Sequence, residues 1–380
     1  MVAKYDIMIV GAGLYGATCA RLLTDKGYRC LIVEKNSYVG GLCASRRQNG
    51  IDVHIHGPHV FHTKNKEVWE FVNKYAKFNA YKHVETMIAN GKIWSLPIDT
   101  LAYNTMFGSI DAIHAYKDIK TEIDNYNVKQ STSFEDSLIM QYGTSIYVEL
   151  FKNYYEKKFG KPCSELAPIM PDMQPSYFRL AKQMHENEFQ GIPMDGYTAM
   201  VENIIGNDIP VLLNKDFVEN IDKMYSLADT IIYTGPIDAL GKYVYGPLDW
   251  ACTEMKTIDE SMRGTQIYGN AVTKIADKSN DLLRITEHKW FNPERMNDKE
   301  WKLHNIVTYE TRKTWTVDDY PMYAIMSQES IERCKKYEKH IYSILSKVVM
   351  GGTKGMYVNM SMDETIQAAF DTCAKIKAKS

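Results

Sequence analysis

An apolar run, Tyr5–Val10, begins the regular pattern of the chain and has the composition of a buried strand in a parallel sheet. Residues 14–26 follow with helical character, and Gly27 stands where it would end the helix. A second apolar run, Cys30–Val33, ends at Glu34. The pattern therefore predicts a strand, a glycine turn, a helix, a second strand and then an acidic residue.

The residue types in this turn suit a bound dinucleotide. Gly11 permits a tight turn, Gly13 has no side chain to keep a pyrophosphate from the backbone, and Gly16 lets the helix pack close to the strand. The helix N-terminus offers free N–H groups and a positive dipole end to phosphates. The residues that we assign to the cofactor here are Gly11, Gly13, Leu14, Tyr15, Gly16, Glu34 and Lys35. The alternative is the same βαβ unit without a phosphate ligand.

Two features narrow the choice of dinucleotide. Glu34 stands about twenty residues after the turn, where a carboxylate accepts from a ribose hydroxyl and disfavours the 2′-phosphate of NADP. A second glycine pair follows in Gly40-Gly41-Leu42, and it would let backbone lie along an extended cofactor. This second pair favours FAD over NAD, with contacts from Gly41 and Leu42. An ordinary Gly-Gly turn is the alternative.

The remaining pattern alternates helices with groups of strands. Two strand-like runs flank Asn90-Gly91, which is a strong signal for a type I′ hairpin turn. Residues 101–158 have helical periodicity throughout, with a predicted start at Ser133. Further helices are expected at 65–75, 198–205, 330–346 and 362–376, and strands at 211–213, 231–233, 255–258, 282–286, 306–309 and 347–350.

Four of the ten histidines, His54, His56, His59 and His62, lie within nine residues. A metal site is one interpretation, but the spacing matches neither a zinc finger nor HExxH, and no cysteine or acid pair stands close by. A second interpretation places the imidazoles against a flavin or a substrate. The third is polar packing within a loop. We expect no metal.

Composition excludes some classes of protein. The 380 residues suffice for two or three domains, and a net charge of −2 with a pI of about 6.6 gives no reason to expect nucleic acid or a membrane surface as partner. No apolar run approaches membrane-spanning length, and no signal peptide is apparent. The seven cysteines show no CxxC spacing, which favours reduced, buried thiols and a cytoplasmic location.

Motifs along almost the whole chain resemble the UDP-galactopyranose mutase family. Besides the glycine fingerprint, they are residues 53–63, 94–97, 155–160, 189–193, 196–198, 232–238, 269–272 and 284–289. The resemblance implies an α/β fold with a discontinuous Rossmann-like FAD-binding domain (1–88, 220–250 and 340–380). It also implies a helical domain (98–170) and an antiparallel β-sheet domain (89–97, 171–219 and 251–339).

The resemblance implies a reaction in which UDP-galactopyranose, or a related nucleotide sugar, is converted to its furanose form. This reaction is redox-neutral overall. Reduced FAD would supply the nucleophile through N5. By their positions in the matching motifs, Arg284 and His59 are expected to be catalytic residues. Arg284 is also expected to bind the diphosphate. Further cofactor residues are His59, Val60, Gly352, Met362 and Asp363, and the substrate residues are His83, Tyr154, Tyr155, Phe159, Asn270, Arg284, Tyr323 and Asn359. An external reductant and a homodimer are also implied.

Several positions depart from the family pattern. Phe159 stands in place of a tryptophan near the nucleoside, and Asn359 in place of a tyrosine. Residues 182–185 read Lys-Gln-Met-His, where the family has a base-contacting tyrosine. Met173 and Thr353 replace two phosphate-side arginines, and each charged hydrogen bond lost weakens binding by roughly 1.5–3 kcal/mol.

These departures keep two alternatives open beside the mutase. One is a family-derived protein that binds FAD but has altered or lost substrate specificity. The other is a flavin oxidoreductase of the amine-oxidase type, which the FAD fingerprint alone permits.

Overall fold

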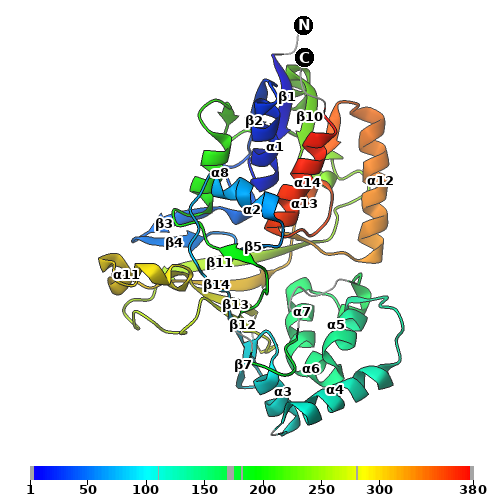
Figure 1. Cartoon of the computed structure of the whole chain (residues 1–380). Coiled ribbons are helices and arrows are strands. Elements are labelled where there is room, and N and C mark those ends of the chain that lie inside the picture. The colour runs from blue at the N-terminus through cyan, green and yellow to red at the C-terminus, as the bar shows by residue number, and fades with distance from the viewer. Residues whose placement is uncertain (1–3, 110, 169–174, 181–182, 280, 377–380) are drawn as a thin grey trace.

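A five-stranded parallel sheet joins segments from the two ends and the middle of the chain (Figure 1). The computed structural model describes residues 4–109, 111–168, 175–180, 183–279 and 281–376. The strand order is β16-β10-β1-β2-β9, and every pair is parallel. The strands are β1 (Tyr5–Val10), β2 (Cys30–Val33), β9 (Val211–Leu212), β10 (Ala228–Tyr233) and β16 (Val348–Met350).

Helices cover both faces of this sheet, which explains the near-continuous apolar runs of its strands. Ile7 and Ile9 of β1 pack on one face with α1 (Leu14–Asp25), α8 (Tyr197–Ile205) and α14 (Met362–Ala374). Met8 and Val10 pack on the other face with α10 (Ile237–Leu240) and α12 (Gln328–Ile344). The predicted strand, turn, helix and strand are confirmed.

A seven-stranded sheet forms the middle of the molecule, in the order β15-β11-β14-β13-β12-β6-β7. Its strands are β6 (Glu85–Ala89), β7 (Lys92–Leu96), β11 (Trp250–Asp259), β12 (Val272–Ile275), β13 (Leu282–Glu287), β14 (Ile306–Lys313) and β15 (Tyr323–Ala324). All neighbours are antiparallel except β12 and β6. Asn90 and Gly91 both have positive φ, at 49° and 73°, so the predicted type I′ turn is confirmed.

Helices from the second quarter of the chain lie at the end of the molecule opposite β1 (Figure 1). They are α3 (Thr100–Phe107), α4 (Ala112–Tyr126), α5 (Phe134–Tyr142), α6 (Thr144–Ile146) and α7 (Lys152–Phe159), with one π-helical turn before α7. The predicted start at Ser133 is confirmed, because its side chain and that of Asp136 form a capping box. Trp94 and Leu96 of the hairpin share the core of these helices.

Shorter elements connect these parts. They are β3 (Ser45–Gln48), β4 (Ile51–His54), β5 (Phe61–Thr63), α2 (Lys66–Asn73), β8 (Phe189–Gly191), α9 (Ile221–Met224), α11 (Lys299–Leu303) and α13 (Gly352–Gly355). All seven cysteines are buried free thiols. None of the helices within the described ranges combines the length and apolar character that a membrane crossing requires.

The packing of three segments crosses the expected domain boundaries. A boundary at 88/89 would cut β6, whose whole length pairs with β7 in the seven-stranded sheet. Strand β9, expected in the antiparallel domain with residues 171–219, pairs with β2 in the parallel sheet. Helix α12 begins within 251–339 but packs on the parallel sheet. Each segment packs with the part of the molecule that buries its apolar side. The order of the segments along the sequence does not reveal which part that is.

A buried carboxylate holds the chain where it passes from the parallel sheet to the seven-stranded sheet. Asp238 of α10 is fully buried and accepts hydrogen bonds from the backbone N–H of Leu248 (2.9 Å) and from Nε1 of Trp250 (3.1 Å). The backbone N–H of Ala239 donates to its other oxygen. Trp250 is the first residue of β11, so this carboxylate fixes the start of that strand relative to α10.

We expect Asp238→Ala to lower the free energy of unfolding by about 2–4 kcal/mol, because two buried donors lose their acceptor. Urea denaturation followed by tryptophan fluorescence measures the change. Asp229→Ala, at an exposed position of β10, is the matched control and should change stability by less than about 0.5 kcal/mol. Equal destabilisation by the two variants would contradict this role.

Candidate active site

A cavity of about 870 Å³ opens at the carboxyl ends of the parallel strands. Val10, Val33 and Tyr233, the last residues of β1, β2 and β10, belong to its wall. Arg284 of β13 and Tyr323 of β15 close it from the seven-stranded sheet. The chain passes from β1 through β2 to β9 on one side of β1 and then crosses to β10 on its other side, and such a switch point is where ligands bind in open α/β sheets.

The glycine turn has no room for side chains. Gly11 has a φ of 105°, and a Cβ there would lie 2.1 Å from Oγ1 of Thr234. A Cβ on Gly16 would lie 2.0 Å from the carbonyl oxygen of Gly11. Helix α1 begins after Gly13 without a side-chain cap, and Leu14 and Tyr15 of its first turn line the cavity. The turn therefore fits a phosphate that would accept from the helix N–H groups.

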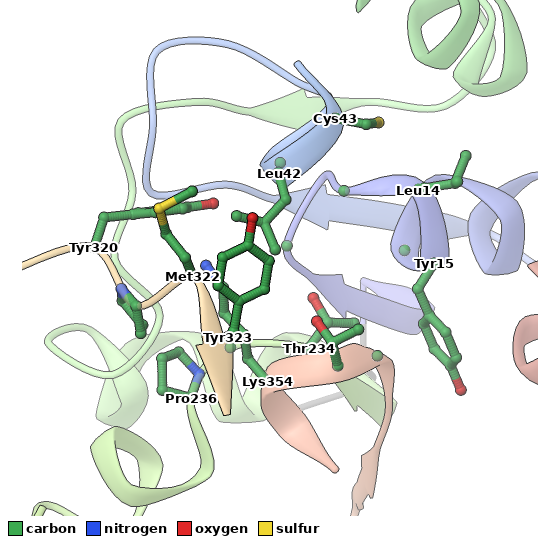
Figure 2. A pocket seen from close by; sticks show the side chains of 18 of the residues that line it. Leu14, Tyr15, Leu42, Cys43, Thr234, Pro236, Tyr320, Met322, Tyr323 and Lys354 are labelled. Carbon is green, nitrogen blue, oxygen red and sulfur yellow. The ribbon is translucent and has the colours of Figure 1, made fainter. Parts of the chain in front are cut away.

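The second glycine pair packs directly against this turn. The N–H of Gly40 donates to the carbonyl of Ala12 (2.8 Å), and a Cβ on Gly41 would lie 3.0 Å from Cα of Gly13. In Figure 2 the Leu42 side chain points into the cavity, whereas the ring of Tyr15 points away from it. Two stretches of bare backbone thus form one side of the cavity.

Glu34 lies on the wall as expected, with its carboxylate held by backbone groups. The N–H of Ala12 donates to Oε2 (2.7 Å) and the N–H of Asn36 to Oε1 (2.8 Å). Each oxygen keeps a second lone pair with which to accept from a ribose hydroxyl. Lys35 also lines the cavity, and its exposed ammonium pairs with Asp216 (3.1 Å). The donors and acceptors in this part of the site therefore fit a dinucleotide.

The four clustered histidines separate into two pairs. His54 is buried and stacks on Phe291, and His56 stacks on Tyr320 with a hydrogen bond to the hydroxyl of Tyr38. His59 and His62 lie on the cavity wall. Within the described ranges, no three His, Cys, Asp or Glu side chains come together in a way that could hold a metal ion.

His59 is held as a neutral imidazole with one free lone pair. Its Nδ1–H donates to the carbonyl of Gly57 at 2.8 Å, which leaves Nε2 as the acceptor. Removal from water, aided by the nearby charge of Arg284, lowers the pKa of His59 to about 4. Val60 lines the cavity beside it. His59 can therefore accept a proton at Nε2 at neutral pH.

Arg284 is fixed on both sides. Its Nε donates to Glu310 of β14 (2.5 Å), and both side chains are nearly buried. A Cβ on Gly57 would lie 2.6 Å from one terminal nitrogen of Arg284. Any residue other than glycine at position 57 would therefore displace that nitrogen. Because Nε is already paired with Glu310, the terminal nitrogens are the groups that can donate to a ligand in the cavity.

Some of the expected site residues lie on this wall and others do not. His83, Tyr323, Asn359, Gly352 and Met362 line the cavity. Tyr154, Tyr155, Phe159, Asn270 and Asp363 are not among its lining residues. Met173 and Lys182 lie outside the described residues.

The expected residues off the wall are engaged elsewhere. Tyr155 packs edge-on against Phe134 among the helices, as core aromatic residues do. The amide of Asn270 donates to the carbonyl of Val272 (2.8 Å) and to Thr86. Asp363 accepts from the hydroxyl of Ser361. These contacts give each of the three residues a structural role.

Asn359 lines the cavity, but both polar atoms of its side chain form hydrogen bonds with the backbone. Its Oδ1 accepts from the N–H of Ala324 (3.1 Å), and its Nδ2 donates to the carbonyl of the same residue (3.0 Å). The side chain thereby continues the edge of β15 as a strand would. The residue found where the family has a tyrosine thus connects the segment after α13 to the seven-stranded sheet.

Sequence reasoning missed a lysine at the cofactor end. The ammonium of Lys354 lies 3.5 Å from the centre of the Tyr320 ring, and Figure 2 shows its side chain between Tyr320 and Tyr323. Burial lowers the pKa of Lys354 to about 7, although Glu34 opposes the shift. Its position directly after Thr353 was the available signal, since an arginine was expected one residue earlier.

A second group that sequence reasoning missed surrounds His83. His185 stacks on His62 with ring centres 3.6 Å apart, and both residues line the cavity with His83. His83 contacts Glu85 (3.1 Å), which also pairs with Lys274 of β12 (2.5 Å). Burial opposes ionisation of Glu85, but Lys274 and His83 outweigh it and hold the pKa well below its usual range. No sequence motif brings these residues together.

Comparisons with known sequences agree with this geometry. A family model for UDP-galactopyranose mutase matches residues 149–358, and one for an NAD(P)-binding Rossmann-like domain matches residues 9–75. A protein from Klebsiella pneumoniae named "Probable UDP-galactopyranose mutase" is 30% identical over 97% of this chain and 93% of its own length. A dTDP-fucopyranose mutase from Escherichia coli is 28% identical over 98% of both chains.

Solved structures show the same fold. A reduced UDP-galactopyranose mutase matches with a TM-score of 0.71 at 14% identity, over 99% of this chain and 96% of the other. A putrescine oxidase with redesigned cofactor binding matches with a TM-score of 0.54 at 11% identity, over 99% of this chain and all of the other. The family model, which covers more than half of the chain, and the full-length Klebsiella relative establish that this chain belongs to the UDP-galactopyranose mutase family.

Proposed function

We propose that the protein is an FAD-dependent, redox-neutral mutase that interconverts the pyranose and furanose forms of a nucleotide sugar. One observation carries the proposal: a single cavity connects the glycine turn and Glu34 with His59, Arg284 and Tyr323. Cofactor-binding and phosphate-binding groups therefore share one enclosed space. Such an arrangement suits a reaction in which the cofactor itself reacts with the sugar.

The wall supports FAD as the cofactor. Residues at the glycine turn would hold its pyrophosphate, and Glu34 would accept from its ribose. The second glycine pair, Gly40 and Gly41, lines the same cavity as Arg284. Reduced FAD, when bound, supplies a nucleophile at N5. We expect the enzyme to need an external reductant for this state, and a homodimer remains a prediction.

The chain's own groups would position the sugar and its leaving group. The terminal nitrogens of Arg284 would donate to diphosphate oxygens, with Glu310 holding the guanidinium in place. Nε2 of His59 would accept a proton from a sugar hydroxyl, with Nδ1 fixed by Gly57. Tyr320 and Tyr323 close one side of the cavity and would keep water from the reacting centre.

We propose UDP-galactopyranose or a related nucleotide sugar as the substrate. The relatives are named for both UDP-linked and dTDP-linked sugars, so nucleotide and sugar both belong in the assay. His185, Thr353 and Asn359 stand at positions where the family pattern has other residues. These differences favour a related sugar and also motivate the alternative of a homologue with altered or lost specificity.

The direct test uses the purified protein with FAD reduced by dithionite. We expect it to convert UDP-galactofuranose, or a dTDP-linked furanose, to the pyranose form without net redox change, as resolved by chromatography. The oxidised protein should be inactive. Hydrogen peroxide release from amines would instead indicate an oxidase. Nucleotide-sugar binding without ring exchange, across a panel of such sugars, would indicate a homologue that has lost the reaction.

We expect Arg284→Lys to weaken UDP binding by roughly 10- to 100-fold, because lysine cannot reproduce the hydrogen bonds of the planar guanidinium. Isothermal titration on the FAD-loaded protein measures the affinity, and the flavin spectrum verifies that the cofactor site is intact. Arg263→Lys, at an exposed position paired with Glu260, is the control and should bind as the wild type does. An unchanged affinity in Arg284→Lys would exclude this role.

The pH dependence tests His59. A folded-state pKa of about 4 means that the imidazole stays neutral as pH falls from 8 to 5 and is protonated only near pH 4. At saturating substrate, kcat should therefore be constant from pH 8 to 5 and decline below that range. His59→Gln should lower kcat and remove the acidic decline, with near-UV circular dichroism as a check on folding. A wild-type decline centred near pH 6.5 would contradict the assignment.

A further inference from the structure

Three cations and two carboxylates, namely Arg284, Lys274, Lys158, Glu310 and Glu85, lie together at or behind the cavity wall. Arg284 is paired with Glu310 (2.5 Å), and Lys274 is paired with Glu85 (2.5 Å). All four side chains are at most 15% exposed, and each pair is neutral overall. Lys158 is a third cation in the same region, and no carboxylate of the described residues lies within 4.0 Å of its ammonium. Within this group of five side chains, one positive charge is therefore left without a paired carboxylate.

Lys158 lies in the last turn of α7, against two aromatic rings. Its ammonium is 4.7 Å from the centre of the Tyr323 ring and 5.3 Å from that of Phe159. Cation–π contacts hold the ammonium in place without neutralising it. Tyr323 belongs to the wall of the main cavity, and so the ammonium stands next to that wall.

A second cavity, of about 460 Å³, adjoins the first at this point. Lys158 and Phe159 line the second cavity, and Trp315 and Val317 line both. Lys158 thus lines the second cavity and contacts Tyr323, which lines the first.

The neighbouring lysines of the same segment already have hydrogen-bond or ion-pair partners. The ammonium of Lys157 donates to the backbone carbonyls of Asp277 and Leu282, each at 2.7 Å. Lys161 pairs with Asp249 at 3.0 Å. Burial, followed by the nearby charge of Arg284, lowers the pKa of Lys158 to about 8. A bound anion would relieve both effects, whereas the neutral pairs would offer it hydrogen bonds but no net charge.

We propose that Lys158 binds the diphosphate of the nucleotide sugar and supplies the net positive charge at that subsite. The inference rests on the proposed function, since it assumes a nucleotide sugar in the cavity. Met173 and Thr353 occupy positions where the family pattern has phosphate-side arginines, so a cation is needed from elsewhere. A lysine on α7 supplies it from the helical end of the site.

The test compares Lys158→Met and Lys158→Arg in the FAD-loaded protein, with UDP-galactose and dTDP-glucose as titrants. Lys158→Met should weaken binding by roughly 10- to 100-fold, the range expected for loss of one charged hydrogen bond. Lys158→Arg should bind within about threefold of wild type. Uridine, which has no phosphate, should bind all variants equally. Lys278→Gln removes an exposed lysine paired with Glu156 of α7, and this control should bind normally.

The pH dependence distinguishes a charge at the diphosphate from mere support of the fold. The groups that face Lys158 are Arg284 of β13, Glu310 of β14, Lys274 of β12, Glu85 of β6 and Tyr323 of β15. As pH rises through about 8 the lysine loses its proton, so wild-type affinity for UDP-galactose should fall between pH 7 and 8.5. Lys158→Arg should keep its affinity over this range, because arginine stays charged.

Normal binding by Lys158→Met would overturn the inference while the proposed function stands, provided that the wild type binds and turns over a nucleotide sugar. Equal weakening in the Met and Arg variants, with uridine binding also lost, would show a structural role and overturn it as well. Failure of the wild type to bind any nucleotide sugar would reject the proposed function, and this inference with it.

Discussion

The site depends on three parallel strands whose ends are joined at close range by backbone groups and by the side chain of Thr234. Gly11 follows β1, and its Cα lies so close to Thr234, after β10, that any Cβ would overlap the hydroxyl. That hydroxyl donates to the carbonyl of Val10 (2.7 Å), and the N–H of Gly351, after β16, donates to Tyr233. Because the strand ends are tied together at van der Waals distance, the backbone there can face a ligand directly.

Charge balance is the second constraint, and it differs between the two ends of the cavity. At the cofactor end, Glu34 satisfies backbone donors and faces Lys354. At the other end, Glu310 is paired with Arg284 and Glu85 with Lys274. Each end therefore has a lysine held against an aromatic ring, Lys354 against Tyr320 and Lys158 against Tyr323. The arrangement also explains why the lost arginines need not leave the site without positive charge.

The sequence predicted correctly those elements of the fold that depend on residues close together in the chain. Strand β1, the glycine turn and the Asn90-Gly91 hairpin are each determined by residues within a few positions of one another. Family resemblance supplied Arg284, whose place on the wall no periodicity indicates. What the sequence did not reveal depends on distant partners: β9 joins the parallel sheet only because β2 lies beside it. The surplus charge of Lys158 likewise appears only once Glu310 and Glu85 are assigned to other cations.

The two hydrogen bonds between Asn359 and Ala324 make a bridge across the rim of the cavity. One end of the bridge belongs to the segment between α13 and α14, which lines the proposed cofactor part of the cavity, and the other to β15, which lines the proposed substrate part. The rim cannot widen at this point unless both hydrogen bonds break together. Exchange of a bulky cofactor would have to use another side of the cavity or open this bridge, whereas a small reductant could reach the interior with the bridge intact.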